Sequence, residues 1–341
     1  MIRTKGAKVK YGILLFFWIS LAFGNECEVK RAAFDIGSGA TKMKVATVDI
    51  CLDKIVKMLA EDSVPVPFKE DLQKSAQNKL SAGVIKQGIL ALRKLKQKAQ
   101  SVGATEFYAS ATSAFRTASN GEEAIKTFSK ETQIQIFLIN QKLEGKLGFA
   151  AASSVSPNPM DKTIVWDIGG GSMQIVAEGK NGLEVYEGKI ASVSFKDHIV
   201  EVIEKRTNVT TPNPINKTHY DQAYHDARVV AKFAVPPELK EKIKAKDYVV
   251  VGIGGVHSHS IGKRIGVKNK ESYTSQRLEA TLPSLLNMTD EALESPYAAT
   301  EVSNMILVKA FMDELAIEKV VVGEINLADG LLLSGKKLIQ N

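Results

Sequence analysis

The sequence predicts an α/β fold made of two halves that face each other across a cleft. An aspartate ends an apolar β run and opens a glycine-rich turn twice, in DIGSGATK at 35–42 and in DIGGGS at 167–172. Strand-like segments flank each turn, and segments with helical spacing follow. With 341 residues, 44% of them hydrophobic, the chain can bury a core in each of two domains.

Residues 1–24 have the composition of a secretory signal peptide. Four cations at positions 3–10 precede an uncharged, mostly apolar run at 11–24. A run of about 14 residues is shorter than the ~20 that cross a bilayer. The sequence therefore predicts an exported protein, periplasmic or secreted. The alternative is an uncleaved anchor, and only then is a membrane a partner.

The charge of the chain excludes one class of partner. The formal net charge is +7, and setting aside the four cations of residues 1–24 leaves +3. Such a small excess does not predict capture of nucleic acid by a basic surface. Selectivity for an anion must therefore come from a local arrangement of residues.

Two cysteines, Cys27 and Cys51, lie at equal distances from position 39 in the first glycine turn. If 29–36 and 41–49 form an antiparallel hairpin around that turn, the two side chains lie almost opposite each other. Opposed residues come within reach of a disulfide, which an oxidising compartment allows. The alternative is two unrelated free thiols. The predicted export favours the bridge.

The first half, residues 25–155, is predicted to be one domain. The hairpin supplies its first two strands, and apolar residues at helical spacing between Leu80 and Ala99 indicate an amphipathic helix. After the hairpin we expect a strand at 54–62, a helix at 80–102, a strand at 106–110, a helix at 122–132, a strand at 134–139 and a helix at 141–154. This order is typical of a mixed sheet covered by helices.

The second half, residues 156–341, is predicted to repeat the pattern after a turn-rich boundary at 153–162. The expected strands are 163–167, 173–178, 183–188 and the apolar run 248–253. The expected helices are 193–205, 218–233, 274–286 and 297–316. The repeat is one of architecture, because each half begins with a β-hairpin.

Both glycine turns suit a phosphorylated ligand. Residues with little or no side chain let backbone N–H groups approach an anion, and a carboxylate beside them can hold a hydrated divalent cation. A glycine turn after a strand often has only a structural role. Two of them in one chain predict a pair of phosphate clamps on opposite sides of a cleft.

Two further segments lie between the turns: ATSAFRTASNG at 111–121 and LEGKLGF at 143–149. With the two aspartate turns, in this order and at these distances, they resemble the exopolyphosphatase/guanosine pentaphosphate phosphohydrolase (Ppx/GppA) family. The resemblance covers nearly all of residues 30–335. It implies the actin-like ATPase superfold, in which two ribonuclease H-like domains enclose an active-site cleft. It also implies a homodimer as an oligomeric state to test.

The resemblance implies a role for each matching residue. Glu144 corresponds to the catalytic base that activates water, and Asp35 and Asp167 to the pair that positions Mg²⁺ beside the terminal phosphate. Arg116 and Lys42 would neutralise charge on the transferred phosphoryl group. The groups expected to cradle phosphate oxygens are Gly37, Ser38, Gly39, Gly169, Gly170, Gly171 and Ser172.

Some positions depart from the family pattern. Gln174 stands where exopolyphosphatases usually carry glutamate, and an arginine expected near 298–301 is missing. After Gly254 and Gly255, His257 and His259 are expected at solvent or at the edge of the substrate rather than on a metal. GGGSMQI at 169–175 and EGKLGF at 144–149 also resemble the apyrases, which hydrolyse nucleotides in the same superfold.

The sequence thus predicts an exported, Mg²⁺-dependent phosphoanhydride hydrolase that releases terminal phosphate from inorganic polyphosphate. One alternative is an apyrase-like nucleoside tri- or diphosphate hydrolase. The other is a sensor that binds polyphosphate or nucleotide and turns it over weakly, which the departures at Gln174 and near 298–301 would favour.

Overall fold

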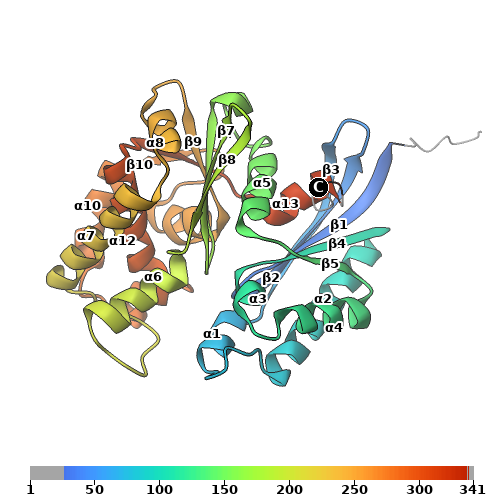
Figure 1. The fold of residues 1–341 in the computed structure, drawn as a ribbon, viewed down its shortest axis with the longest axis horizontal. Helices are drawn as coiled ribbons and strands as arrows, with labels where there is room; N and C mark the ends of the chain where they lie inside the picture. Colours follow the sequence, from blue (N-terminus) through green and yellow to red (C-terminus); the bar gives the residue numbers. More distant parts are fainter. Residues whose placement is uncertain (1–26, 336, 338–341) are drawn as a thin grey trace, which may run out of the picture.

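The computed structural model describes residues 27–335 and 337 and shows two lobes side by side, each built on a twisted sheet (Figure 1). The predicted signal segment, 1–24, lies outside the described residues. Among the helices of residues 27–335, none has both the length and the hydropathy needed to cross a bilayer.

The first sheet has the strand order β3-β2-β1-β4-β5. Its strands are β1 (Glu28–Ile36), β2 (Ala40–Asp49), β3 (Lys54–Pro65), β4 (Glu106–Ala111) and β5 (Gln135–Leu138). The first three form an antiparallel meander, whereas β4 and β5 run parallel to β1. The parallel pairs need crossover connections, which contain α2 (Ala82–Ser101) and α4 (Gly121–Thr132). The side chain of Ser81 caps α2 by accepting a hydrogen bond from Val84 N.

The second sheet repeats this arrangement with one strand more, in the order β10-β11-β9-β6-β7-β8. Its strands are β6 (Thr163–Ile168), β7 (Met173–Gly179), β8 (Gly182–Gly188), β9 (Val249–Ile253), β10 (Ser272–Thr274) and β11 (Lys319–Val322). Strands β6, β7 and β8 form the meander, and β9 and β11 run parallel to β6. Each half therefore has the ribonuclease H-like topology, as predicted.

The remaining helices of the described chain lie outside the sheets. In the first half these are α1 (Phe68–Gln73), α3 (Ser113–Thr117) and α5 (Gln141–Ala152). In the second half they are η1 (Met160–Lys162), α6 (Ser192–His198), η2 (Ile199–Ile203), α7 (Lys217–Ala234), α8 (Pro237–Lys244), η3 (Val256–Gly262), α9 (Lys263–Ile265), α10 (Ser275–Leu285), α11 (Asp290–Leu293), α12 (Ala298–Leu315) and α13 (Leu327–Ser334).

Most predicted elements are present, with two kinds of difference. The helix expected at 193–205 ends at His198 and continues as a π-helical segment to Ile203, and the strand expected at 54–62 extends to Pro65. Short helices such as α1, α3 and α8 were not predicted. Segments of five to eight residues are too short to show a helical period, so tertiary contacts decide their conformation.

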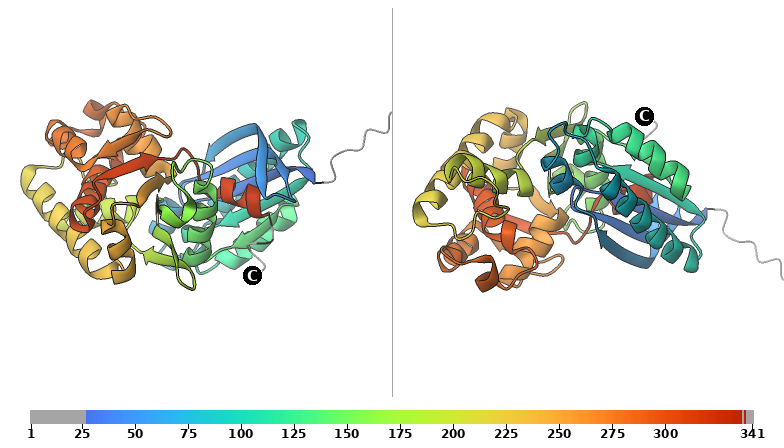
Figure 2. Two further views of the ribbon diagram at one scale, coloured as in Figure 1. Left: turned by 90° about the horizontal axis from the view of Figure 1, so that it is seen from above. Right: turned by 90° about the horizontal axis from the view of Figure 1, so that it is seen from below.

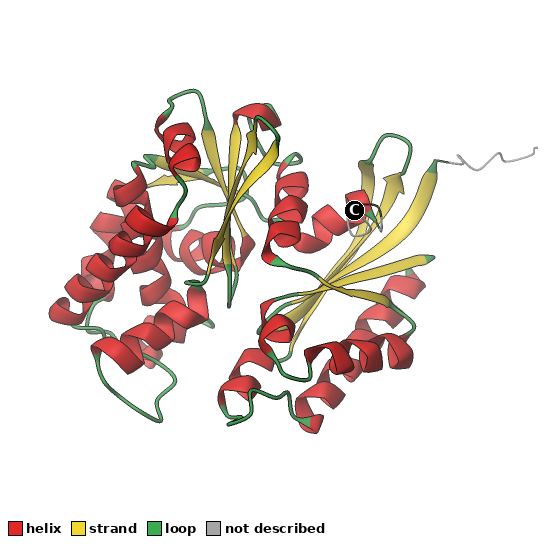
Figure 3. Ribbon diagram, in the orientation of Figure 1, coloured by secondary structure: helices red, strands yellow, loops and turns green. Residues whose placement is uncertain are grey.

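Each sheet is covered on both faces (Figure 3). Helices α2 and α4 cover the outer face of the first sheet, and α7, α10 and α12 cover that of the second. Helix α5 packs Phe149 and Ala152 on the inner face of the second sheet, while Leu147 faces Ala33 and Val48 of the first. Helix α5 is therefore shared by the two lobes.

Helix α13 belongs in sequence to the second half but packs on the first sheet, between β1 and α5 (Figure 1). Lys44 of β2 donates to both carboxylate oxygens of Asp329, at 2.8 and 2.7 Å, and both residues are buried. Arg31 of β1 donates to the carbonyl of Leu332 at 2.6 Å. The predicted domain boundary at 155/156 assigns α13 to the second domain, whereas its buried residues Leu327, Leu331 and Leu332 pack with residues of the first lobe.

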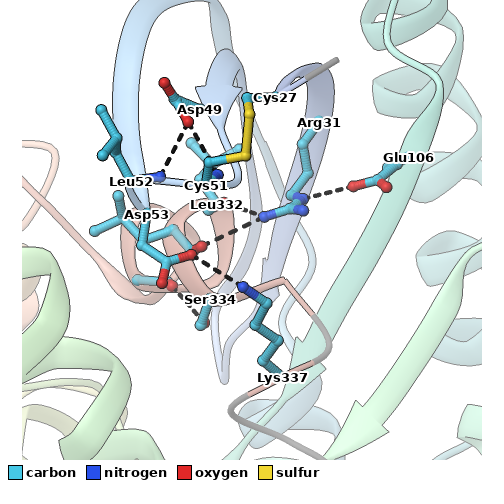
Figure 4. Close-up of polar contacts among 12 residues, drawn as sticks. Cys27, Arg31, Asp49, Cys51, Leu52, Asp53, Glu106, Leu332, Ser334 and Lys337 are labelled. Carbon is cyan, nitrogen blue, oxygen red and sulfur yellow. Dashed lines mark hydrogen bonds and ion pairs between the residues drawn. A yellow bond between two sulfur atoms is a disulfide. The ribbon is translucent and has the colours of Figure 1, made fainter.

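The free end of the first hairpin is closed by a disulfide between Cys27 and Cys51, which confirms the predicted pairing (Figure 4). Glu28 pairs with Asp49 in the β1–β2 register, so the cysteines flank the last pair of the ladder. Lys337 contacts Asp53 nearby, so residue 337, which follows α13, lies close to the loop that holds Cys51. Figure 2 shows that this end of the first lobe is the one farthest from the second lobe.

Candidate active site

The two glycine turns have the same construction. The N–H of Gly37 donates to Ala40 O at 3.0 Å, and the N–H of Gly169 donates to Ser172 O at 3.0 Å. These two amides, predicted to hold phosphate, are therefore engaged inside their own turns. The amides of Ser38, Gly39, Gly170 and Gly171 have no backbone acceptor in the described part of the chain, so they remain for a phosphate.

Backbone N–H groups at the start of a helix donate hydrogen bonds to the carbonyl groups of each turn. Lys69 N, in the first turn of α1, donates to Ser38 O at 2.9 Å. In the second half, Ser192 N and Val193 N, at the start of α6, donate to Gly169 O at 3.2 Å and Gly170 O at 2.8 Å. These bonds occupy the turn carbonyls, so the turns are held rigidly at the ends of their strands.

The two turns meet each other and the start of α3. A Cβ atom built on Gly171 would lie 3.2 Å from Ser38 Oγ and 2.6 Å from Ser113 Oγ. A side chain at position 171 would thus push the halves apart. Glycine is required here by the close approach of the two loops, since its backbone angle is an ordinary one. Ser113 lies in the ATSAFR segment but was not singled out as a site residue.

The two aspartates lie at equivalent places in the two sheets. Asp35, near the end of β1, pairs across the ladder with Lys42 of β2, and Asp167, near the end of β6, pairs with Gln174 of β7. All except Lys42 are buried, and Lys42 is half-buried. Asp35 Oδ1 has no hydrogen-bond partner among the described residues. Gly254 leaves room for Asp167, because a Cβ at 254 would lie 2.5 Å from Asp167 Oδ1.

Glu144 lies in the first turn of α5, which Asn140 caps by accepting from Leu143 N at 2.8 Å. Arg116 Nη1 donates to Glu144 Oε2 at 2.8 Å and to the carbonyl of Ile139, also at 2.8 Å. Ser172 Oγ donates to Glu144 Oε1 at 3.2 Å, and Arg116 Nη2 lies 3.3 Å from the same hydroxyl. Glu144 is thus hydrogen-bonded to the second glycine turn through Ser172 and paired with Arg116, which comes from α3 in its own half of the chain.

The three carboxylates of the site interact electrostatically. Burial, together with the charges of Glu144 and Asp35, raises the pKa of Asp167 to about 7, against a smaller opposite effect of Lys42. Burial also raises the pKa of Asp35, which Lys42 lowers. For Glu144, burial outweighs the lowering effect of Arg116, so its pKa is raised as well. Such a concentration of negative charge in a buried place is the electrostatic signature of a functional site.

The donor set fits a hard divalent cation. Asp35 and Asp167 supply buried carboxylate oxygens from opposite sides of the cleft, and Asp35 Oδ1 lacks a partner within residues 27–335. Oxygen donors of this kind suit Mg²⁺, which keeps several of its waters and binds through one or two carboxylates. A bound cation would also offset the mutual repulsion of the three acids.

The two histidines after Gly255 lie in different environments. His257 is fully buried and shares a 2.6 Å hydrogen bond with the hydroxyl of Tyr273, and burial lowers its pKa to about 3. The expectation of a solvent or substrate-edge position is therefore wrong for His257, because η3 turns it into the core beside Trp166. His259 is half-exposed, and its ring lies nearly parallel to that of Tyr297.

The sequence pattern of the Ppx/GppA phosphatase family matches residues 47–338. The chain belongs to the Ppx/GppA phosphatase family. The class of chemistry that this membership supports is the hydrolysis of phosphoric anhydrides. The resemblance drawn from the four sequence segments is therefore confirmed at the level of the family.

One curated relative is a bifunctional 3-dehydroquinate synthase/phosphatase of Fusobacterium nucleatum. It is 26% identical over 270 residues, which make up 77% of this chain and 37% of the relative. The chain thus spans little more than a third of that relative's length.

Solved structures show the same fold. The Aquifex aeolicus member of the Ppx/GppA family superimposes with a TM-score of 0.71 at 17% identity, over 92% of this chain and 99% of that one. An exopolyphosphatase from Cytophaga hutchinsonii gives a TM-score of 0.68 at 18% identity, over 91% and 98%. The fold predicted from the sequence is thereby confirmed.

Proposed function

We propose that this family member releases the terminal phosphate of inorganic polyphosphate with the help of Mg²⁺. The observation that carries the proposal is the position of Glu144, which is hydrogen-bonded to one phosphate loop through Ser172 and acts electrostatically on Asp35 and Asp167. An acid between two anion-binding loops can accept a proton from water at the point where a terminal phosphoryl group would lie.

The positions of the site residues suit each of them to a different role in the reaction. The free amides of the two turns would bind and orient the phosphoryl oxygens, and Lys42 lies beside them as a positive charge. Arg116 fixes the rotamer of Glu144 and supplies a second cation at the cleft. Glu144 would take the proton of the attacking water. Mg²⁺, held by Asp35 and Asp167, would supply positive charge to the phosphoryl oxygens when bound.

The place of action is proposed to be outside the cytosol, in the periplasm or the surrounding medium. The composition of residues 1–24 and the Cys27–Cys51 disulfide support this. A nucleoside triphosphate is the second candidate substrate, because Gln174 gives the second turn the apyrase-like sequence GGGSMQI at 169–175.

The test is a phosphate-release assay of the full chain with long polyphosphate, tripolyphosphate and ATP, each with Mg²⁺ and with EDTA. We expect release that depends on Mg²⁺. Glu144→Gln is expected to lower kcat by about 10²–10⁴-fold, because it removes the base.

The matched control is Glu301→Gln, since Glu301 is also a buried glutamate paired with an arginine, Arg264, but lies in the second lobe's helical layer. This control should lose stability and keep its turnover. Full activity of Glu144→Gln would remove the assigned base. Tight binding of polyphosphate by the wild type without any phosphate release would show a sensor instead.

A further inference from the structure

A hydrogen bond outside the catalytic cluster joins the two lobes. Gln73 Nε2, at the end of α1, donates to Asp197 Oδ2 in α6 at 2.5 Å. Figure 1 shows these two helices facing each other below α5 and α13, which lie between the lobes on the other side. We call the bond between Gln73 and Asp197 the clasp, because it lies opposite the helices that the two lobes share.

Helix α1 is fixed to the first glycine turn and to the helix that carries Arg116. The N–H of Lys69 donates to Ser38 O at 2.9 Å. The ring of Phe68 packs on that of Phe115 in α3, with ring centroids 4.8 Å apart. A displacement of α1 would therefore move the first phosphate loop and α3 with it.

Helix α6 is fixed to the second glycine turn in the same way. The N–H of Val193 donates to Gly170 O at 2.8 Å. At the other end of the helix, Lys196 Nζ lies 2.8 Å from Asp197 Oδ1 and donates to Thr210 O at 2.9 Å. These contacts orient the carboxylate of Asp197, and its second oxygen forms the clasp.

The clasp can open without exposing either core. The buried side chains of α1, Phe68 and Leu72, pack in the core of the first lobe, and Phe195 of α6 packs in that of the second. Gln73 is exposed and Asp197 is half-buried. A polar contact of this kind changes the ratio of closed to open lobes by about two- to fivefold. The clasp therefore suits a device that sets the position of the lobes and adds little to the stability of the fold.

We propose that Gln73 and Asp197 are positioning residues that hold the two phosphate loops opposite each other. The inference rests on the proposed hydrolase function, in which both loops bind the same terminal phosphoryl group. Neither residue touches the substrate. Gln73 acts through α1 on the loop at Ser38, and Asp197 acts through α6 on the loop at Gly170. When the clasp opens, the two loops separate and the site for the phosphoryl group is incomplete.

The test changes the charge at position 73 of the full-length protein. Because Asp197 is negative, Gln73→Glu should repel it, Gln73→Ala should only remove the bond, and Gln73→Lys should form an ion pair. We expect kcat/KM for tripolyphosphate to fall about two- to fivefold in the alanine variant and about tenfold in the glutamate variant. The lysine variant should equal or exceed the wild type. The melting temperature should be the same in all four proteins, because no core contact changes.

A second substitution and a change of salt separate positioning from a structural fault. Gln73→Glu combined with Asp197→Asn should return kcat/KM to within about twofold of the wild type, because the asparagine amide donates to the new carboxylate. The defect of Gln73→Glu alone should shrink in about 0.5 M NaCl, which screens exposed charges. Asp247→Ala is the matched control, since Asp247 also accepts a 2.5 Å bond, from Lys162, but within the second lobe. It should keep wild-type kcat/KM.

The separation of the lobes is measured with spin labels. Leu90→Cys in α2 and Val229→Cys in α7 place one label on an exposed position of each lobe, and the two native cysteines are bonded to each other. With non-hydrolysable imidotriphosphate bound, the longer distances should gain population in Gln73→Glu and lose it in Gln73→Lys.

Wild-type kcat/KM in Gln73→Glu, or unchanged label distances, would overturn the inference and leave the hydrolase intact. A loss of activity that Asp197→Asn does not restore would also overturn it, because the loss would not come from the clasp. A wild type that releases no phosphate would overturn the hydrolase, and the label distances would still decide whether the clasp sets the separation of the lobes.

Discussion

The close approach of the two phosphate loops makes Gly171→Ala a decisive substitution. The new Cβ would lie 2.6 Å from Ser113 Oγ, about 0.8 Å closer than ordinary contact. Rotating the serine hydroxyl away does not remove the conflict, because Ser113 Cβ would still lie 3.1 Å away and Ser38 Oγ 3.2 Å away on the other side. The methyl group must therefore separate the two loops by several tenths of an ångström.

That displacement acts on the geometry of the reaction more than on the fold. Overpacking of this size costs roughly 1–3 kcal/mol of stability. A misplacement of reacting groups by up to 1 Å can cost about 10²-fold in rate. We expect kcat/KM of Gly171→Ala for tripolyphosphate to fall by about 10²-fold while the protein stays folded at 25 °C.

The assay is steady-state phosphate release, with circular dichroism to confirm folding. The double variant Gly171→Ala, Ser113→Gly should have a kcat/KM at least tenfold higher than that of Gly171→Ala, because the second change removes the side-chain atoms nearest to the new Cβ. Gly255→Ala is the control, since a Cβ there meets nothing within 4 Å and its backbone is helical. Wild-type activity in Gly171→Ala, or no recovery in the double variant, would refute the claim that the loops touch in the working enzyme.

Two predictions concern the buried charges. Asp329→Ala should lower the free energy of unfolding, measured by urea titration, by about 3–5 kcal/mol, because it leaves Lys44 buried and unpaired. The double variant Lys44→Met, Asp329→Leu should recover most of this lost stability. Equal losses of stability in the two variants would contradict this. The pKa of Asp167 is about 7 in the folded protein against an ordinary 3.8, so the folded state holds the extra proton and stability falls as the pH rises through that window. Asp167→Asn should therefore gain stability over the metal-free wild type between pH 4 and pH 7, measured as melting temperature in EDTA, and a constant difference across that range would be the contrary result.

Much of the fold was predictable because its signals are local in the chain. Asp35 and Asp167 each follow a short apolar run, at 32–34 and 164–166, and precede a glycine turn, and the hairpin symmetry of Cys27 and Cys51 predicted the disulfide. The short elements could not be predicted from the sequence. Helix α3 carries Arg116 in only five residues, and the buried position of His257 follows from the π-helical turn after Gly254 rather than from any periodic pattern.

The sequence by itself determined the family, the two repeated halves and the residue types at the centre, since motifs and hydrophobic periods are properties of neighbouring residues. Only the tertiary structure decided which of those residues meet. It joined Glu144 to Arg116 and Ser172, and it engaged the amides of Gly37 and Gly169 inside their own turns. It also packed α13 on the first lobe and left the amide of Gln174 without a hydrogen-bond partner among the described residues. The physical reason is that hydrogen bonds, burial and charge–charge energies depend on distances between segments far apart in the chain, which only the packing of the two sheets around α5 sets.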